Sequence, residues 1–171
     1  MTAKQTRYQI LSAQWPEDTE EARRLLANYG QYLAANPTGG TGICIADYDA
    51  ELRSLPGKYA TTQADLLLAR VDRDSAGCVA VTERVLSDGM QAAEMKRLWV
   101  EPRFRGFGIG RGLVTAAIDW TRERQRSALV LDTVDEAMPE ASVLYRSLGF
   151  SEISRFNENP VPGVRFYQLP L

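Results

Sequence analysis

The period of the hydrophobic positions changes several times along the chain, and each change predicts a different element. Apolar residues recur at helical spacing from Ala22 to Leu33 and from Ile109 to Trp120, which predicts two amphipathic helices. Shorter apolar runs, bounded by turn-forming residues, predict strands. The predicted strands are 7–11, 66–71, 77–83, 92–100, 128–131, 150–155 and 165–169.

Capping residues and helix breakers place the ends of the helices. Asp18 and Glu21 have the spacing of a capping box at the start of the first helix. The long helix is predicted over 108–126, and a short one begins near Pro139 and stops at Gly149. Residues 41–63 have the weakest pattern, with a short helix predicted at 47–52.

The resulting order is β-α-(α)-β-β-β-α-β-α-β-β, where the bracket marks the weakly predicted helix. This order predicts an α/β fold with a mixed central sheet of six to seven strands and helices on both faces. A chain of 171 residues is the size of one ordinary domain, so we expect a single domain over residues 1–171.

Composition narrows the chemistry. The net charge is −2, which argues against a nucleic-acid partner. The chain has no run of 18 apolar residues and no signal-peptide pattern, so we expect no membrane association and a cytoplasmic location. Cys44 and Cys78 make neither a disulfide scaffold nor a zinc site, and we expect Cys78 to be a buried thiol and no metal to be bound. Histidine is absent, so acid–base chemistry falls to Asp, Glu, Tyr, Lys, Cys or water.

A glycine- and arginine-rich segment, residues 103–113, lies between a predicted strand and the long helix. Glycines let backbone N–H groups approach a ligand, and a helix N-terminus adds unpaired donors, so this segment suits a pyrophosphate. Neither the dinucleotide pattern G-x-G-x-x-G nor the P-loop pattern G-x-x-x-x-G-K-[ST] fits, whether it is started at Gly106 or at Gly108. The pattern that remains is Arg105-x-x-Gly108-x-Gly110.

That pattern resembles the acyl-CoA pyrophosphate loop of the GCN5-related N-acetyltransferases, the GNAT superfamily. The resemblance implies a GNAT fold, in which the fourth and fifth strands are splayed and the pantetheine arm of CoA pairs with the fourth strand. The cofactor-binding residues that it implies are Leu98, Trp99 and Val100 on that strand and Arg105, Gly106, Phe107, Gly108, Ile109, Gly110 and Arg111 in the loop.

Residues 143–150 contain Leu-Tyr-x-x-x-Gly-Phe, which also resembles the family. The resemblance implies that Tyr145 protonates the leaving thiolate, whereas a core tyrosine would only pack its ring. A glutamate at the offset of Glu94 serves as general base in some members. Period two places 94, 96, 98 and 100 on one face unless a bulge intervenes, and Glu83 is a competing carboxylate. The chain departs from the family at Met138, where many members carry an asparagine that contacts the cofactor.

The function implied is transfer of an acetyl group from acetyl-CoA to a primary amine of a small molecule or amino acid, by direct attack in a ternary complex. A CoA-binding sensor without catalysis, and acetylation of a protein lysine or N-terminus, stay open as alternatives. The connector 157–163 is either a plain link between strands or a wall of the acceptor site. A homodimer through the exposed sheet edge also stays open.

Overall fold

A seven-stranded sheet forms the centre of the computed structural model, which describes residues 7–36 and 45–171. Its order is β1-β2-β3-β4-β5-β7-β6, and all neighbours are antiparallel except β4 and β5. The strands are β1 (Tyr8–Ser12), β2 (Ala64–Val71), β3 (Asp74–Val85), β4 (Gln91–Val100), β5 (Ala128–Val134), β6 (Ser151–Ile153) and β7 (Val164–Pro170). Cys44 lies outside the described residues.

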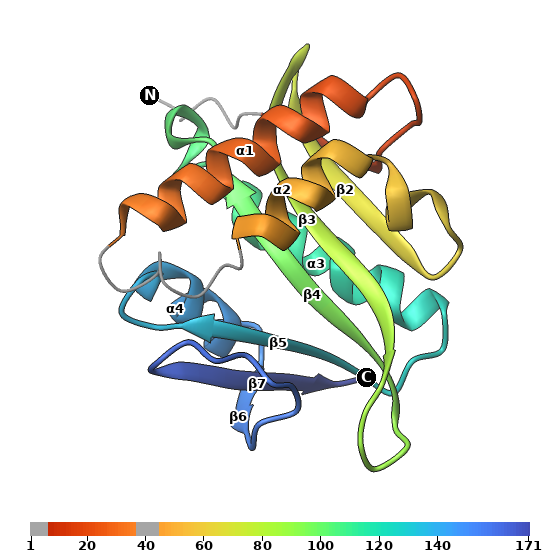
Figure 1. Ribbon diagram of the computed structural model, residues 1–171, viewed down its shortest axis with the longest axis vertical. Coiled ribbons are helices and arrows are strands. Elements are labelled where there is room, and N and C mark those ends of the chain that lie inside the picture. The colour runs from red at the N-terminus through yellow and green to blue at the C-terminus, as the bar shows by residue number, and fades with distance from the viewer. Residues whose placement is uncertain (1–6, 37–44) are drawn as a thin grey trace.

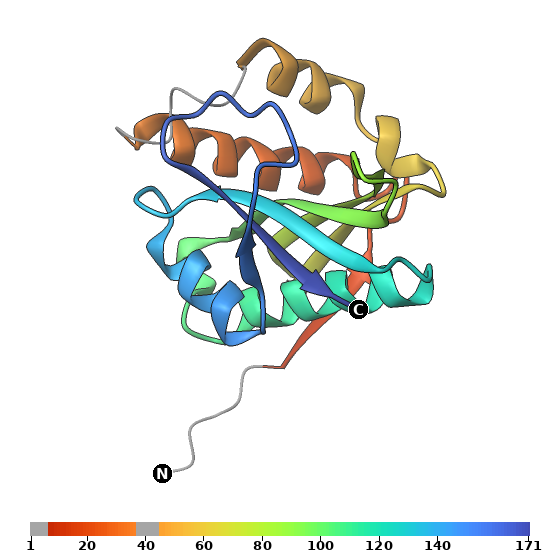
Figure 2. The same cartoon turned by 90° about the horizontal axis from the view of Figure 1, so that it is seen from below.

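Helices cover both faces of the sheet, as Figure 2 shows. Within the described ranges the four α-helices are α1 (Thr19–Ala35), α2 (Ile45–Ser54), α3 (Ile109–Glu123) and α4 (Pro139–Ser147), and short 3₁₀ turns occupy Gly57–Ala60 and Pro102–Phe104. Leu25 and Leu26 of α1 pack on one face of the sheet, whereas Leu113 and Val114 of α3 pack on the other. The mixed α/β architecture and the predicted order of elements are therefore confirmed.

The fourth and fifth strands, β4 and β5, separate along their length, as the resemblance to the GNAT fold predicts. Only Ala93 with Leu129 and Glu94 with Val130 are paired between β4 and β5. Beyond these pairs β4 continues to Val100 and β5 to Val134, and Figure 1 shows the two strands running apart. The separation opens a gap in the sheet between the ends of two neighbouring strands.

A β-bulge intervenes in β4, so residues 94, 96, 98 and 100 do not share one face. Cys78 of β3 pairs with Trp99, but Ala80 pairs with Lys96, so β4 has one extra residue between these pairs. Arg97 lies there with a φ of 61°, in the left-handed region. The bulge reverses the alternation: Met95 packs in the α3 core, and after the bulge it is Leu98 that faces this core.

Two local expectations are also corrected. Asp18 and Glu21 do not form a capping box, because the Asp18 carboxylate accepts a hydrogen bond from the backbone N–H of Gln14 and ion-pairs with Arg70. The sixth strand is shorter than predicted, because the chain leaves the sheet after Ile153. Cys78 is fully buried as expected, and burial raises the pKa of its thiol to about 12.

Candidate functional site

The glycine-rich segment forms a sharp loop that leads into the N-terminus of α3. Gly106 and Gly108 have φ values of 83° and 79°, which favour glycine because a side chain would be strained there. Gly108 is the N-cap of α3 and has no side-chain capping bond. The first helical hydrogen bond runs from Gly112 N–H to Gly108 C=O. The N–H groups that precede Gly112 in the helix therefore have no helical acceptor and can donate to an anion.

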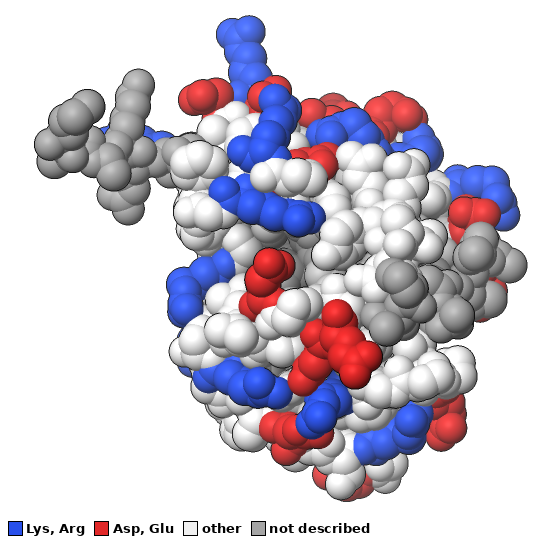
Figure 3. All heavy atoms as spheres, turned by 90° about the vertical axis from the view of Figure 1, so that its left-hand side faces the viewer, with Lys and Arg blue, Asp and Glu red and all other residues white. Residues whose placement is uncertain are grey.

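Two arginines border this loop and are held by neutral partners. Arg105 Nε donates to the Val100 carbonyl at 3.1 Å, and its guanidinium lies 4.9 Å from the centroid of the Trp99 ring. Arg111 donates to Ser147 Oγ at 2.7 Å. Neither arginine has a carboxylate partner among the described residues, so both retain charge for an anionic ligand. Figure 3 shows one face of the molecule, where several basic side chains lie over the upper part with acidic ones between them.

A cavity of about 460 Å³ lies between the end of β4, this loop and α4. Nine of the ten residues predicted to bind the cofactor line it: Leu98, Trp99, Val100, Arg105, Gly106, Gly108, Ile109, Gly110 and Arg111. Phe107, the tenth, is 48% exposed and does not line this cavity. The structure thus brings the strand and the loop of the prediction together around one space.

A second cavity, of about 430 Å³, adjoins the first, and Leu98 and Met138 line both. Its wall combines residues of α1, α2, β4, β5 and α4 with the connector at Asn157, Asn159, Pro160 and Val161. Of the two interpretations of this connector, the geometry therefore supports a cavity wall. The polar side chains around the second cavity include Tyr29, Tyr48, Glu51, Arg84, Lys96, Arg97, Asp132 and Tyr145.

Tyr145 lines the second cavity with a ring that is packed in the core. Its ring centroid lies 5.8 Å from that of Phe150 and 6.4 Å from that of Tyr167. Its hydroxyl has no hydrogen-bond partner within the described part of the chain. Burial raises the pKa of Tyr145, and the nearby Tyr29 and Asp132 raise it further, so the phenol stays protonated at neutral pH.

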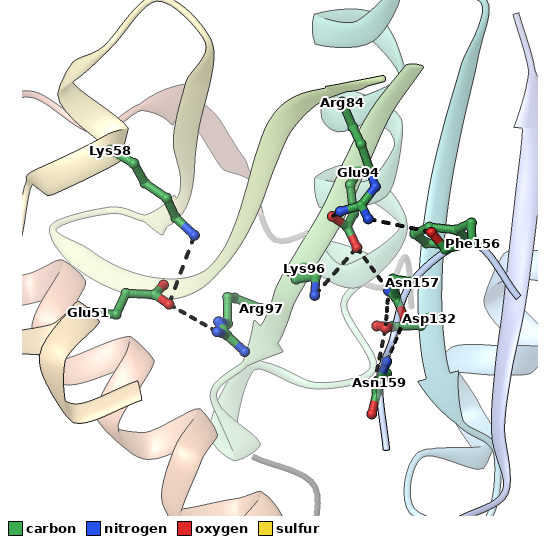
Figure 4. A network of polar contacts seen from close by, with 10 residues as sticks. All are labelled: Glu51, Lys58, Arg84, Glu94, Lys96, Arg97, Asp132, Phe156, Asn157 and Asn159. Atoms are coloured by element: carbon green, nitrogen blue, oxygen red, sulfur yellow. Dashed lines mark hydrogen bonds and ion pairs between the residues drawn. The ribbon is translucent and has the colours of Figure 1, made fainter. Parts of the chain in front are cut away.

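Glu94 is buried but does not line either cavity. Its carboxylate ion-pairs with Arg84 at 2.7 Å and with Lys96 at 3.4 Å, and it accepts a hydrogen bond from the Asn157 amide at 3.4 Å. Figure 4 shows it enclosed by these side chains. The competing carboxylate, Glu83, ion-pairs with Arg126 at 2.8 Å. The structure therefore does not place Glu94 beside Tyr145 in the cavity.

The bulge residue Arg97 joins β4 to α2. Its guanidinium pairs with Glu51 at 2.9 Å and lies 4.8 Å from the centroid of the Tyr48 ring. Burial lowers the pKa of Arg97, but the charge and hydrogen bond of Glu51, together with Tyr29 and Tyr59, outweigh that effect, so the net shift is upward and the group remains charged. The Arg97–Glu51 ion pair fixes α2 over the second cavity. The sequence pattern did not predict this ion pair.

Asp132 is a further polar residue that the sequence reasoning missed. It lies on β5 just past the strand's last pair with β4, and it accepts hydrogen bonds from the amides of Asn157 and Asn159 at 2.7 and 3.0 Å. The available signal was its position directly after the buried run 128–131, at the carboxyl end of a parallel strand, where ligands bind in open α/β sheets.

No helix in 7–36 or 45–171 is both long enough and apolar enough to cross a membrane. Within the same ranges, no three His, Cys, Asp or Glu side chains are grouped as metal ligands.

The splayed β4–β5 pair and the glycine loop at a helix N-terminus are the features expected of the GNAT fold. Residues 62–152 match the family model described as "Acetyltransferase (GNAT) domain". An uncharacterised N-acetyltransferase of Schizosaccharomyces pombe is 32% identical over 169 residues, which cover 98% of each chain. The chain therefore belongs to the GNAT family of acetyltransferases.

Solved structures agree on the fold. An acetyltransferase from Streptococcus agalactiae superposes with a TM-score of 0.74 at 22% identity and covers 96% of this chain and 98% of its own. Spermidine N-acetyltransferase from Vibrio cholerae, solved in complex with CoA and spermine, superposes with a TM-score of 0.68 at 18% identity and covers 95% of each chain. At these identities the likeness establishes the shared fold alone.

Proposed function

We propose that the protein transfers an acetyl group from acetyl-CoA to a primary amine of a small molecule or amino acid. One observation carries this proposal: the cavity at the glycine loop adjoins the polar cavity that contains Tyr145, and both share Leu98 and Met138. A donor in the first cavity and an amine in the second would meet where the cavities join, so direct attack in a ternary complex needs no covalent enzyme intermediate.

The residues present fit acetyl-CoA. The α3 N-terminus has uncapped N–H donors and no acidic residue in its first turn, and it suits the pyrophosphate together with Arg105 and Arg111. The backbone of Leu98, Trp99 and Val100 is on the β4 side of the gap, where no β5 residue pairs with it, and suits the amide groups of the pantetheine arm. The bound thioester supplies the acetyl group.

The chain supplies binding, polarisation and proton transfer. A backbone N–H of β4 near the bulge would stabilise negative charge on the thioester oxygen. Tyr145, which burial keeps protonated, would donate its proton to the sulfur. The sequence resemblance implies Glu94 as the base, but the Glu94 carboxylate is already paired with Arg84 and Lys96. Spermidine, the amine in the name of the Vibrio cholerae relative, is a small primary amine of the kind proposed for this chain.

Calorimetric titration with acetyl-CoA, with NADH as the control ligand, tests this function first. We expect micromolar binding of acetyl-CoA and none of NADH. The Arg105→Glu/Gly108→Glu variant should lose acetyl-CoA binding, because it places negative charge and a strained side chain in the loop. Release of CoA is then measured on a panel of small amines. Absence of binding at millimolar acetyl-CoA would refute the transferase proposal.

A further inference from the structure

Asp132 is the carboxylate that β5 presents to the second cavity after it separates from β4. Val130 pairs with Glu94, and Asp132 lies two residues further along β5, where β4 no longer provides a partner. On its other side β5 remains paired with β7, with Asp132 opposite Phe166. The side chain is therefore held on a paired strand, beside a space that the sheet leaves open.

The connector fixes the direction of the two amides that hold this carboxylate. The Asn157 side-chain oxygen accepts the backbone N–H of Asn159 at 3.0 Å, and the Asn159 side-chain oxygen accepts that of Val161 at 3.0 Å. Because both amide oxygens are used in these turns, both NH₂ groups face Asp132. They donate to the same oxygen, Oδ2, at 2.7 and 3.0 Å, as Figure 4 shows.

Asp132 Oδ1 is left without a protein partner within the described residues, and no described Lys or Arg pairs with this carboxylate. A partly buried carboxylate without a cation favours a cationic ligand. Tyr145 lines the same cavity as Asp132, and the charge of Asp132 contributes to the raised pKa of that phenol.

Glu94 offers the opposite arrangement. Arg84 and Lys96 already neutralise its carboxylate, and it lies outside the lining of the cavity. An acceptor ammonium at Glu94 would have to displace these cations, whereas at Asp132 it would meet a free oxygen.

We propose that Asp132, and not Glu94, binds the ammonium group of the acceptor and accepts a proton from it. This inference rests on the proposed function. The acceptor ammonium loses one proton through Asp132 to solvent, and its nitrogen then forms the bond to the acetyl carbon while the carbon–sulfur bond breaks. Tyr145 gives its proton to the sulfur. The nitrogen then loses a second proton, which returns to Tyr145 through water. The products are an amide and free thiol, with one proton released overall.

The test compares Asp132→Asn with Glu94→Gln in the full chain, using an amine that the wild-type protein acetylates. Because a general base contributes roughly 100-fold or more, Asp132→Asn should lower kcat/KM for the amine by at least about 100-fold at pH 7. Its Kd for acetyl-CoA should stay within about twofold of the wild-type value, because the cavity at the glycine loop is unchanged. Glu94→Gln should lose far less activity, and Asp119→Asn, on the exposed face of α3, is the matched control.

A pH series separates chemistry from a merely structural role. The neutral fraction of an amine of pKa about 10 rises roughly tenfold per pH unit below that value. A neutral amine needs no base before attack, so the deficit of Asp132→Asn should shrink steadily from pH 7 to pH 9.5. A constant deficit over this range would indicate a structural role and overturn the proposal.

The remaining outcomes are also decisive. A larger loss in Glu94→Gln than in Asp132→Asn, with acetyl-CoA binding intact in both, would return the role to Glu94 and leave the acetyltransferase function standing. Binding of acetyl-CoA by the wild-type protein without turnover of any amine would instead refute the proposed function, and this inference with it.

Discussion

Tyr145 shows how a single residue can be tied to the core and still be available for chemistry. Its ring packs against Phe150 and Tyr167, so its position is fixed by aromatic contacts. Its hydroxyl forms no hydrogen bond with any described group, and the residue lines the second cavity. The hydroxyl of a buried tyrosine that serves structure alone usually has a partner, so this arrangement favours a role toward a ligand.

The substitution Tyr145→Phe should therefore separate activity from stability. We expect kcat to fall by about 100-fold or more, because a proton donor to the sulfur is removed. The acetyl-CoA Kd should stay within about twofold, and the free energy of unfolding within about 1 kcal/mol, because no protein hydrogen bond is lost. Steady-state kinetics, calorimetry and urea unfolding measure the three quantities.

Tyr167→Phe is the matched control. The Tyr167 hydroxyl accepts from Arg146 at 2.7 Å and donates to Asp135 at 3.3 Å, and it does not line either cavity. This variant should lose about 1 kcal/mol of stability and keep its kcat within about threefold. Unchanged kcat in Tyr145→Phe would remove the proton-donor role.

Among the elements, the pairing of β3 with β4 depends on a close approach at Gly77. A methyl group there would lie 2.4 Å from the Trp99 carbonyl oxygen, a backbone atom that cannot turn aside. Trp99 lines the cavity at the glycine loop, so this contact also sets the position of the wall of that cavity. Gly110, in the first turn of α3, is different. A methyl group there would lie 3.7 Å from its nearest neighbour, a side-chain carbon of Leu144.

Alanine substitutions at these two glycines should have opposite effects on stability. Gly77→Ala should lower the free energy of unfolding by about 1–3 kcal/mol, the usual range for overpacking. Gly110→Ala should leave it unchanged or raise it by up to about 1 kcal/mol, because alanine favours the helix. Urea unfolding of both variants measures the difference. Equal stabilities would mean that β3 and β4 are not held as closely as the structure has them.

The order of elements followed from the sequence because local signals set it. The apolar stripe of α3, the stop at Gly149 and the buried run of β5 can each be read within a dozen residues. The glycine loop could also be predicted, since its spacing excludes other phosphate motifs and its glycines adopt the positive φ that such loops require.

The acceptor side of the site could not be predicted because tertiary contacts create it. Arg97 is a non-glycine residue in the left-handed region, and the ion pair with Glu51, 46 residues away, accompanies that strain. Its bulge reverses the faces of β4 and separates Glu94 from Leu98. Asp132 meets Asn157 and Asn159 only after the chain has passed through α4 and β6.

For the whole molecule, the sheet is weakest where the proposed cofactor binds. Between β1–β4 and β5–β7 the strand pairing is limited to two residue pairs, as the separation in Figure 1 shows. One hydrophobic core nevertheless spans the junction, since Val81 and Met95 pack in the same cluster as Leu129 and Tyr167. We therefore propose that residues 1–171 unfold as one cooperative domain.

Acetyl-CoA that bridges the end of β4 and α3 should stabilise that whole domain. A ligand at 100 times its Kd adds about 2.7 kcal/mol, and for a chain of this size that raises Tm by roughly 5–10 °C. Differential scanning calorimetry with acetyl-CoA, and with NADH as control, should show one transition that only acetyl-CoA shifts. The Arg105→Glu/Gly108→Glu variant should show no shift, because the anion site is lost. Two separate transitions, of which acetyl-CoA moves only one, would contradict a single domain, since a ligand that stabilises one half alone cannot raise the Tm of an independent second half.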